Sequence, residues 1–117
     1  MNWRVQFAPE ALAQLKALEQ RIAEAGAPLA AERYVHSIVD FCMKLQTFAA
    51  RGVARDDLLP GLRITHFHKR AIIAYLLDRE VVSIVGVFYG GQDYEAELIS
   101  GDEFPSKSYG RGPGGVS

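Results

Sequence analysis

The chain opens with five residues, 3–7, whose apolar and polar side chains alternate, and this pattern predicts a strand. Pro9 and Glu10 then suit the first turn of a helix. The apolar residues that follow lie three or four positions apart and form one stripe: Leu12, Leu15, Leu18 and Ile22. Gly26 followed by Pro28 is typical of the end of a helix. We therefore expect a strand and then one amphipathic helix.

A second helix is predicted to begin near Pro28. Its apolar residues repeat at three- or four-residue spacing over five consecutive steps: Ala31, Tyr34, Ile38, Phe41, Leu45 and Phe48. Two striped helices joined by so short a turn should lie antiparallel, as a helical hairpin.

Three strands are predicted after a loop at residues 49–61. They cover residues 62–67, 71–77 and 81–89, and the short links between them make them antiparallel neighbours. Residues 71–77 are apolar on both faces, so this strand belongs in the centre of the sheet. One further helical turn is expected within 93–99. The predicted fold class is α+β, in the order β-α-α-β-β-β, with the helical hairpin on one face of a mainly antiparallel sheet.

The length and composition of the chain indicate how many domains it contains. With 117 residues, 49% hydrophobic and 23% charged, the chain has the make-up of one globular domain. We assign that domain to residues 1–100, and residues 101–117 to a Gly/Ser/Pro-rich tail that we expect to be mobile. The single cysteine, Cys42, permits no disulfide within the chain, and a buried thiol is expected. No apolar signal core or membrane span is visible, so a cytoplasmic protein is expected.

Charge is unevenly distributed although the net charge is only −1. Residues 51–79 hold six basic and three acidic side chains, whereas residues 80–117 hold two basic and six acidic ones. A net charge near zero argues against a general nucleic-acid binder, since such binding grows with the number of phosphates neutralised. A local basic patch within 51–79 remains open.

No common catalytic or metal-binding motif is present: the sequence has no GxxxxGK loop, no HExxH and no Ser-His-Asp signature. The pair Asp56-Asp57 follows Arg55 in a predicted turn, where a solvated or capping role is expected. We expect neither a metal nor a cofactor.

Several stretches in order resemble a known family. They are Val5 to Ala11 at the strand-to-helix entry, the run from Phe48 to Arg63 ending in Pro-Gly-Leu-Arg, the apolar strand from Arg70 to Leu77, and the closing stretch from Val85 to Tyr94. Together they resemble the RelE/ParE toxin superfamily of type II toxin–antitoxin systems, and its ParE-like branch more closely. Two features depart from the family pattern: Tyr89 stands where histidine is frequent, and Gly91-Gln92 where arginines are usual.

The resemblance implies a toxin that inhibits DNA gyrase by binding and is neutralised by a cognate, ParD-like antitoxin in a hetero-oligomer. An acidic or amphipathic antitoxin segment would fold along the toxin. The residues expected to bind antitoxin or target are Arg51, Arg55, Arg63, Lys69, Arg70, Tyr89 and Tyr94. For the two loop residues Arg51 and Arg55, a role as plain surface charges is equally open.

Two alternatives stay open. The first is a metal-independent endoribonuclease of the RelE type, acting on messenger RNA at the ribosome, whose catalytic residues would be Arg63, Arg70 and Tyr89. Such chemistry needs cations aimed at the developing charge and a group that moves the 2′-OH proton. His66 and His68 suit that proton transfer by residue type, yet a structural or solvated role is the simpler reading. The second alternative is a toxin-derived, non-toxic binding module.

Overall fold

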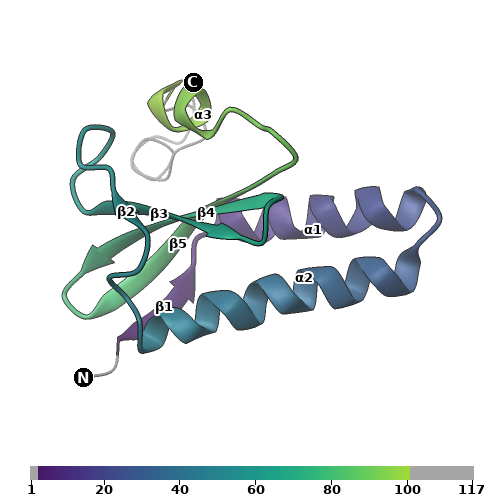
Figure 1. Cartoon of the computed structure of the whole chain (residues 1–117), viewed down its shortest axis with the longest axis horizontal. Helices are drawn as coiled ribbons and strands as arrows, with labels where there is room; N and C mark the ends of the chain where they lie inside the picture. Colours follow the sequence, from purple (N-terminus) through teal and green to yellow (C-terminus); the bar gives the residue numbers. More distant parts are fainter. Residues whose placement is uncertain (1–2, 101–117) are drawn as a thin grey trace.

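The structure is a computed structural model of the chain, and it describes residues 3–100. The predicted boundary at residue 100 and the predicted tail 101–117 lie at or outside the end of the described residues. Figure 1 shows two long antiparallel helices on one side of a twisted sheet and a short helix on the other side. The predicted helical hairpin and the α+β class are confirmed.

The elements follow one another along the chain in this order: β1 (Arg4–Phe7), α1 (Pro9–Glu24), α2 (Pro28–Met43), the 3-10 helix η1 (Lys44–Gln46), β2 (Val53–Ala54), β3 (Leu62–Phe67), β4 (Ala71–Asp78), β5 (Val81–Tyr89) and α3 (Tyr94–Ser100). Among residues 3–100, no helix is both long enough and apolar enough to cross a membrane.

The strands form one five-stranded sheet in the order β1-β5-β4-β3-β2. The predicted central place of β4 is confirmed, and β3, β4 and β5 are antiparallel neighbours as expected. β1 pairs with β5 in parallel, a position that the residue pattern left open. The predicted loop 49–61 was wrong in one respect, because Val53 and Ala54 pair with β3 and form the edge strand β2.

Both faces of the sheet are covered. The face toward α1 and α2 carries the larger core, whose buried members are Ala11, Leu15, Leu18, Ile38, Cys42, Leu45, Ala49, Phe67, Ala71, Ile73, Tyr75, Val82, Ile84 and Val87. The opposite face carries a smaller core, which packs against α3 and the loop before β3: Ala8, Leu62, Ile64, Ala74, Val85, Phe88 and Leu98. Burial on both sides explains why β4 and β5 are largely apolar.

A β-bulge in β5 changes which of its residues face each of these two cores. Ala74 pairs with Gly86 and Tyr75 pairs with Ile84, so Val85 is the extra residue on β5. Val85 consequently joins the smaller core, and beyond the bulge Val87 and Tyr89 face the helices while Phe88 belongs to the smaller core. The bulge thereby places the end of β5 next to α2.

The predicted helical stripes were wrong at two positions. Leu12 lies on α1 but is 53% exposed, and Phe48, beyond η1, is 59% exposed. Phe48 leaves the stripe because α2 ends at Met43 and the chain passes through η1 before it turns toward β2. Leu45 in η1 is the last residue of the stripe that is fully buried.

Gly52 is required where the chain enters β2. Its φ is +87°, and a Cβ at this position would lie 2.4 Å from the Ile64 carbonyl oxygen of β3. Both the backbone conformation and the contact exclude a larger residue. The segment before β2 therefore runs tightly against β3.

We predict that Gly52→Ala lowers the free energy of unfolding by about 3 kcal/mol, since it combines left-handed backbone strain with a backbone clash. Gly91→Ala is the matched control: its φ is +88° but no atom lies within 4 Å of the added Cβ. It should cost only about 1 kcal/mol. Urea unfolding of both variants checks this, and equal losses would contradict the close approach at Gly52.

Candidate functional site

Arg63 is engaged with the main chain. It lies on β3 and is half-buried. Its Nη2 donates to the carbonyl oxygens of Ala50 at 2.7 Å and Gly52 at 3.0 Å, and its Nε donates to that of Arg51 at 3.3 Å. A guanidinium has five donors in a fixed fork, and most of this fork is occupied by three consecutive carbonyl groups.

Tyr75, the cross-strand partner of Arg63, holds the same segment from within the core. The side chain is fully buried. Its hydroxyl bonds the carbonyl oxygens of Ala49, at 3.0 Å, and Arg51. Burial raises the pKa of Tyr75, against a smaller opposing effect of Arg63, so the hydroxyl keeps its proton and acts as a donor. Residues 49–52, the carbonyl segment, are thus fixed by donors from β3 and β4.

Arg55 joins the loop before β3 to α3. Its guanidinium forms a two-bond contact with the Asp57 carboxylate, at 2.9 and 2.8 Å. It also donates from Nη1 to Glu95 at 2.7 Å and to the Tyr94 hydroxyl at 2.9 Å. The hydrogen bond to Asp57, then that to Glu95, raises the pKa of Arg55, and the same contact holds the pKa of Asp57 below its usual value. This network fixes α3 over the smaller core.

The acidic pair therefore has local structural contacts. Asp56 Oδ1 accepts a hydrogen bond from the Gly61 amide at 2.8 Å, which closes the loop before β3 and does not cap a helix. Among residues 3–100, no three His, Cys, Asp or Glu side chains come together as a metal site would require.

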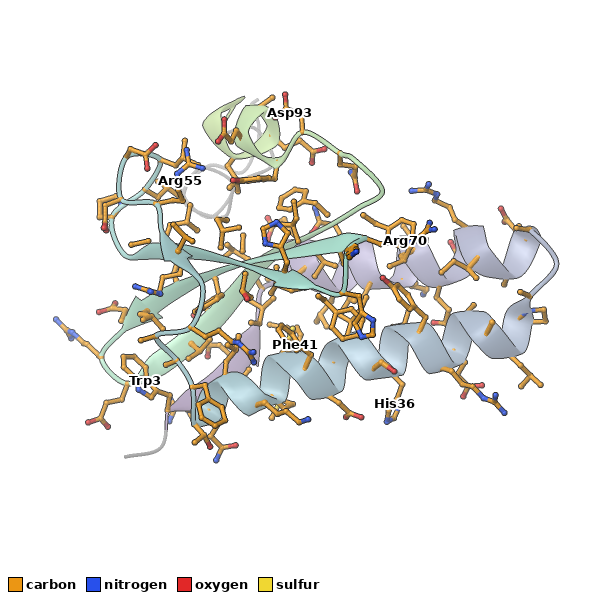
Figure 2. All side chains as sticks on the ribbon, in the orientation of Figure 1. Trp3, His36, Phe41, Arg55, Arg70 and Asp93 are labelled. Carbon is orange, nitrogen blue, oxygen red and sulfur yellow. The ribbon has the colours of Figure 1, made fainter. Side chains whose placement is uncertain are left out.

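The turn between β3 and β4 carries exposed cations. His68, Lys69 and Arg70 are all exposed there, and no ion pair within residues 3–100 engages Lys69 or Arg70. The Arg70 carbonyl accepts a hydrogen bond from the Gly90 amide at 2.8 Å, which ties the turn to the end of β5. Figure 2 shows Arg70 well apart from Arg55, which lies beside α3.

Aromatic rings pack beneath this turn. Tyr34 of α2 contacts Phe67 and Tyr89 edge-on, with centroids 5.8 and 5.7 Å apart. His68 lies over Phe67 at 4.2 Å. The Tyr34 hydroxyl is buried and has no hydrogen-bond partner within residues 3–100. Burial, and secondarily Tyr89, raises its pKa, while Arg70 acts in the opposite direction.

Tyr34 was missed as a functional candidate because its spacing places it in the apolar stripe of α2. The pattern shows which face of the helix is inside but not that one tyrosine hydroxyl there lacks a partner. Its one signal in the sequence is residue type: a tyrosine among aliphatic positions needs a partner for its hydroxyl.

Gln92, which stands where the family usually has arginine, closes the open edge of β5. Its side-chain oxygen accepts a hydrogen bond from the Tyr89 amide at 2.8 Å, and its side-chain nitrogen donates one to the Glu97 carboxylate at 3.2 Å. In the same way, the side-chain oxygen of Gln14 in α1 accepts a hydrogen bond from the Val87 amide at 2.6 Å. β1 pairs with β5 only up to Ile84, so these amides would otherwise be unpaired edge donors.

The predicted site residues fall into three groups. Lys69, Arg70 and Tyr89 lie together at the β3–β4 turn, Arg55 bonds Tyr94, and Arg63 bonds the Arg51 carbonyl. The Arg51 guanidinium lies 5.0 Å from the centre of the Phe41 ring, a cation–π contact. Arg63 precedes Phe67 by four residues, about 13 Å along the strand. Arg63 therefore lies toward the other end of β3 from the turn that carries Arg70 and Tyr89.

Comparison with known proteins agrees with this fold. A family model described as "ParE toxin of type II toxin-antitoxin system, parDE" matches residues 5–94. A solved chain from the "Chromosomal ParDE TA system from P. aeruginosa" superposes with a TM-score of 0.66 at 20% sequence identity. The match covers 75% of the present chain and 96% of the other, and at this identity it supports the fold. No curated protein sequence gives a significant match.

Tyr75 and Tyr34, whose hydroxyl oxygens are both buried, give a matched stability test. Tyr75→Phe should lower the free energy of unfolding by about 2 kcal/mol, because a buried carbonyl loses its donor. Tyr34→Phe should leave it unchanged or raise it, because that hydroxyl has no bond to lose and its burial without a partner costs free energy. Chemical denaturation of both variants measures the difference, and the reverse order would contradict the assigned contacts.

Asp57 gives a pH prediction. Its folded pKa lies below its unfolded value, so its stabilising contribution is complete above the ordinary pKa of 3.8 and is lost as pH falls through the lower folded pKa. Arg55→Gln removes the cause of the shift. We expect stability to fall less steeply in this variant than in the parent on acidification below about pH 5. Urea midpoints across this range give the slopes, and identical slopes would exclude the pair as a source of acid sensitivity.

Proposed function

The chain belongs to the ParE family of toxins of type II toxin–antitoxin systems, and we propose that it acts by binding DNA gyrase and is held inactive by a cognate antitoxin. The family match over residues 5–94 carries the toxin assignment. The neighbouring solved structure comes from a ParDE system, which supports a cognate antitoxin as partner.

The state of Arg63 favours binding over RNA cleavage. A catalytic cation has to face the charge that develops on the reacting phosphate. Arg63 instead donates its hydrogen bonds to the carbonyl segment. Thr65, two residues further along β3, is buried. Gln92, in the place of a usual arginine, is bonded back to Tyr89 and Glu97. A surface that binds a protein target requires none of these groups to react.

The antitoxin is proposed to contact the β3–β4 turn through Lys69 and Arg70. Both side chains are exposed and carry no ion pair within the described chain, so an acidic segment would meet little competition there. Leu12 of α1 and Leu29 of α2 are exposed apolar residues of the helical hairpin, and an antitoxin segment could cover them as well.

The target is tested by expressing the toxin without antitoxin and assaying purified protein on gyrase supercoiling and on translation. Loss of supercoiling with translation intact is the expected result. Loss of translation with supercoiling intact would support the ribonuclease alternative and exclude the gyrase proposal. No effect on either would support a non-toxic binding module.

The antitoxin contact is tested by reversing charge. Lys69→Glu together with Arg70→Glu should weaken antitoxin binding at least about tenfold, because attraction becomes repulsion at two positions. Arg4→Glu, an equally exposed reversal on β1, should change the affinity by less than about threefold. Isothermal titration calorimetry with the purified antitoxin measures the affinity of the unaltered toxin and of both variants. Unchanged affinity of the double variant would remove the turn from the interface.

A further inference from the structure

Four side chains surround a concave site where the β3–β4 turn meets α2. They are Tyr34 from the helix and His68, Lys69 and Arg70 from the turn. Figure 2 shows Arg70 at the end of the sheet, above the helical hairpin. No residue of the Arg63 or Arg55 networks lines this site.

The site offers hydrogen-bond donors and positive charge. Lysine and arginine side chains donate and cannot accept, and a neutral tyrosine hydroxyl donates one proton. Within residues 3–100, neither cation forms an ion pair with a carboxylate. The chemistry of the lining therefore matches an oxygen-rich anion.

The Tyr34 hydroxyl is an independent sign of a missing partner. It is buried, and no hydrogen bond satisfies it among residues 3–100. Such a group costs free energy in the folded protein and is rare unless a bound molecule completes it. An anion that enters beneath the exposed, long side chain of Arg70 would supply the acceptor.

The frame around the site is fixed before any ligand arrives. The left-handed conformation of His68, with φ of 57°, closes the turn, and the bond from Gly90 to the Arg70 carbonyl ties it to β5. The Tyr34 ring is wedged between Phe67 and Tyr89. A donor set on a rigid frame loses little entropy on binding.

We propose that this site, formed by Tyr34, His68, Lys69 and Arg70, binds a phosphate group of a nucleotide or of a nucleic-acid strand. A phosphate monoester has three terminal oxygens and about −1.5 to −2 charge, so it can accept from Tyr34, Lys69 and Arg70 at once. A phosphodiester within a strand accepts through its two terminal oxygens. The site shares Lys69 and Arg70 with the proposed antitoxin contact, but it is tested on the toxin alone, so the outcome depends neither on the antitoxin nor on gyrase.

The test uses the purified full chain and three probes. Inorganic phosphate and a nucleoside monophosphate are titrated by NMR, and a fluorescein-labelled single strand of about 12 nucleotides is titrated by anisotropy. Arg70→Gln should weaken binding about tenfold and Tyr34→Phe about fivefold, since each removes a hydrogen bond to a charged group. Arg79→Gln, which removes an exposed charge from the β4–β5 turn, should change it less than about twofold.

The probes separate the sources. Binding of the small phosphates indicates a site for an isolated phosphate group, and binding of the strand alone indicates a phosphodiester within a chain; both support the proposal when the variants behave as stated. Two results would overturn it: no probe binds, or Arg79→Gln weakens binding as much as Arg70→Gln. Unchanged binding in Tyr34→Phe, whose fold is verified by its unfolding midpoint, would also overturn the assigned site.

Discussion

The hydrogen bonds from Arg63 and Tyr75 to the carbonyl segment 49–52 hold the chain where it passes from the helices to the sheet. This passage fixes several neighbours at once. Gly52 has to approach β3 closely, and the Arg51 side chain is directed over Phe41. The two-residue strand β2 then follows directly against β3. A basic residue and a tyrosine that suggest chemistry thus serve first to position the main chain.

The basic side chains discussed above fall into two groups, those bonded within the described chain and those without an ion pair there. Arg55 and Arg63 are engaged by acidic side chains or main-chain carbonyls, whereas Lys69 and Arg70 have no ion pair within residues 3–100. The free pair lies next to a buried tyrosine hydroxyl that lacks a partner, Tyr34. Both proposed binding functions therefore fall at the β3–β4 turn, at the end of the sheet away from Arg63. A protein partner and a small anion both fit that end by charge.

Much of the fold followed from periodicity. The helices, the hairpin strands and the central place of β4 are set by local spacing and by burial on both faces, which a sequence displays directly. β2, the parallel β1–β5 pairing and the bulge at Val85 depend on contacts between distant segments, which no local pattern encodes. The site was less predictable. By residue type, Arg63 and Arg70 are equal candidates for binding, and only the tertiary contacts show that Arg63 is bonded to main-chain carbonyl groups.

Arg63 bonds three carbonyl oxygens of the carbonyl segment, and we infer that it serves to hold this segment and not to contact target or substrate. The most direct measurement is hydrogen exchange and unfolding of Arg63→Met, which keeps an unbranched side chain but has no donor. The account predicts a loss of about 2 kcal/mol in unfolding free energy, with faster amide exchange around residues 49–54. Unchanged stability and exchange, together with lost toxicity, would contradict it and return Arg63 to the functional surface.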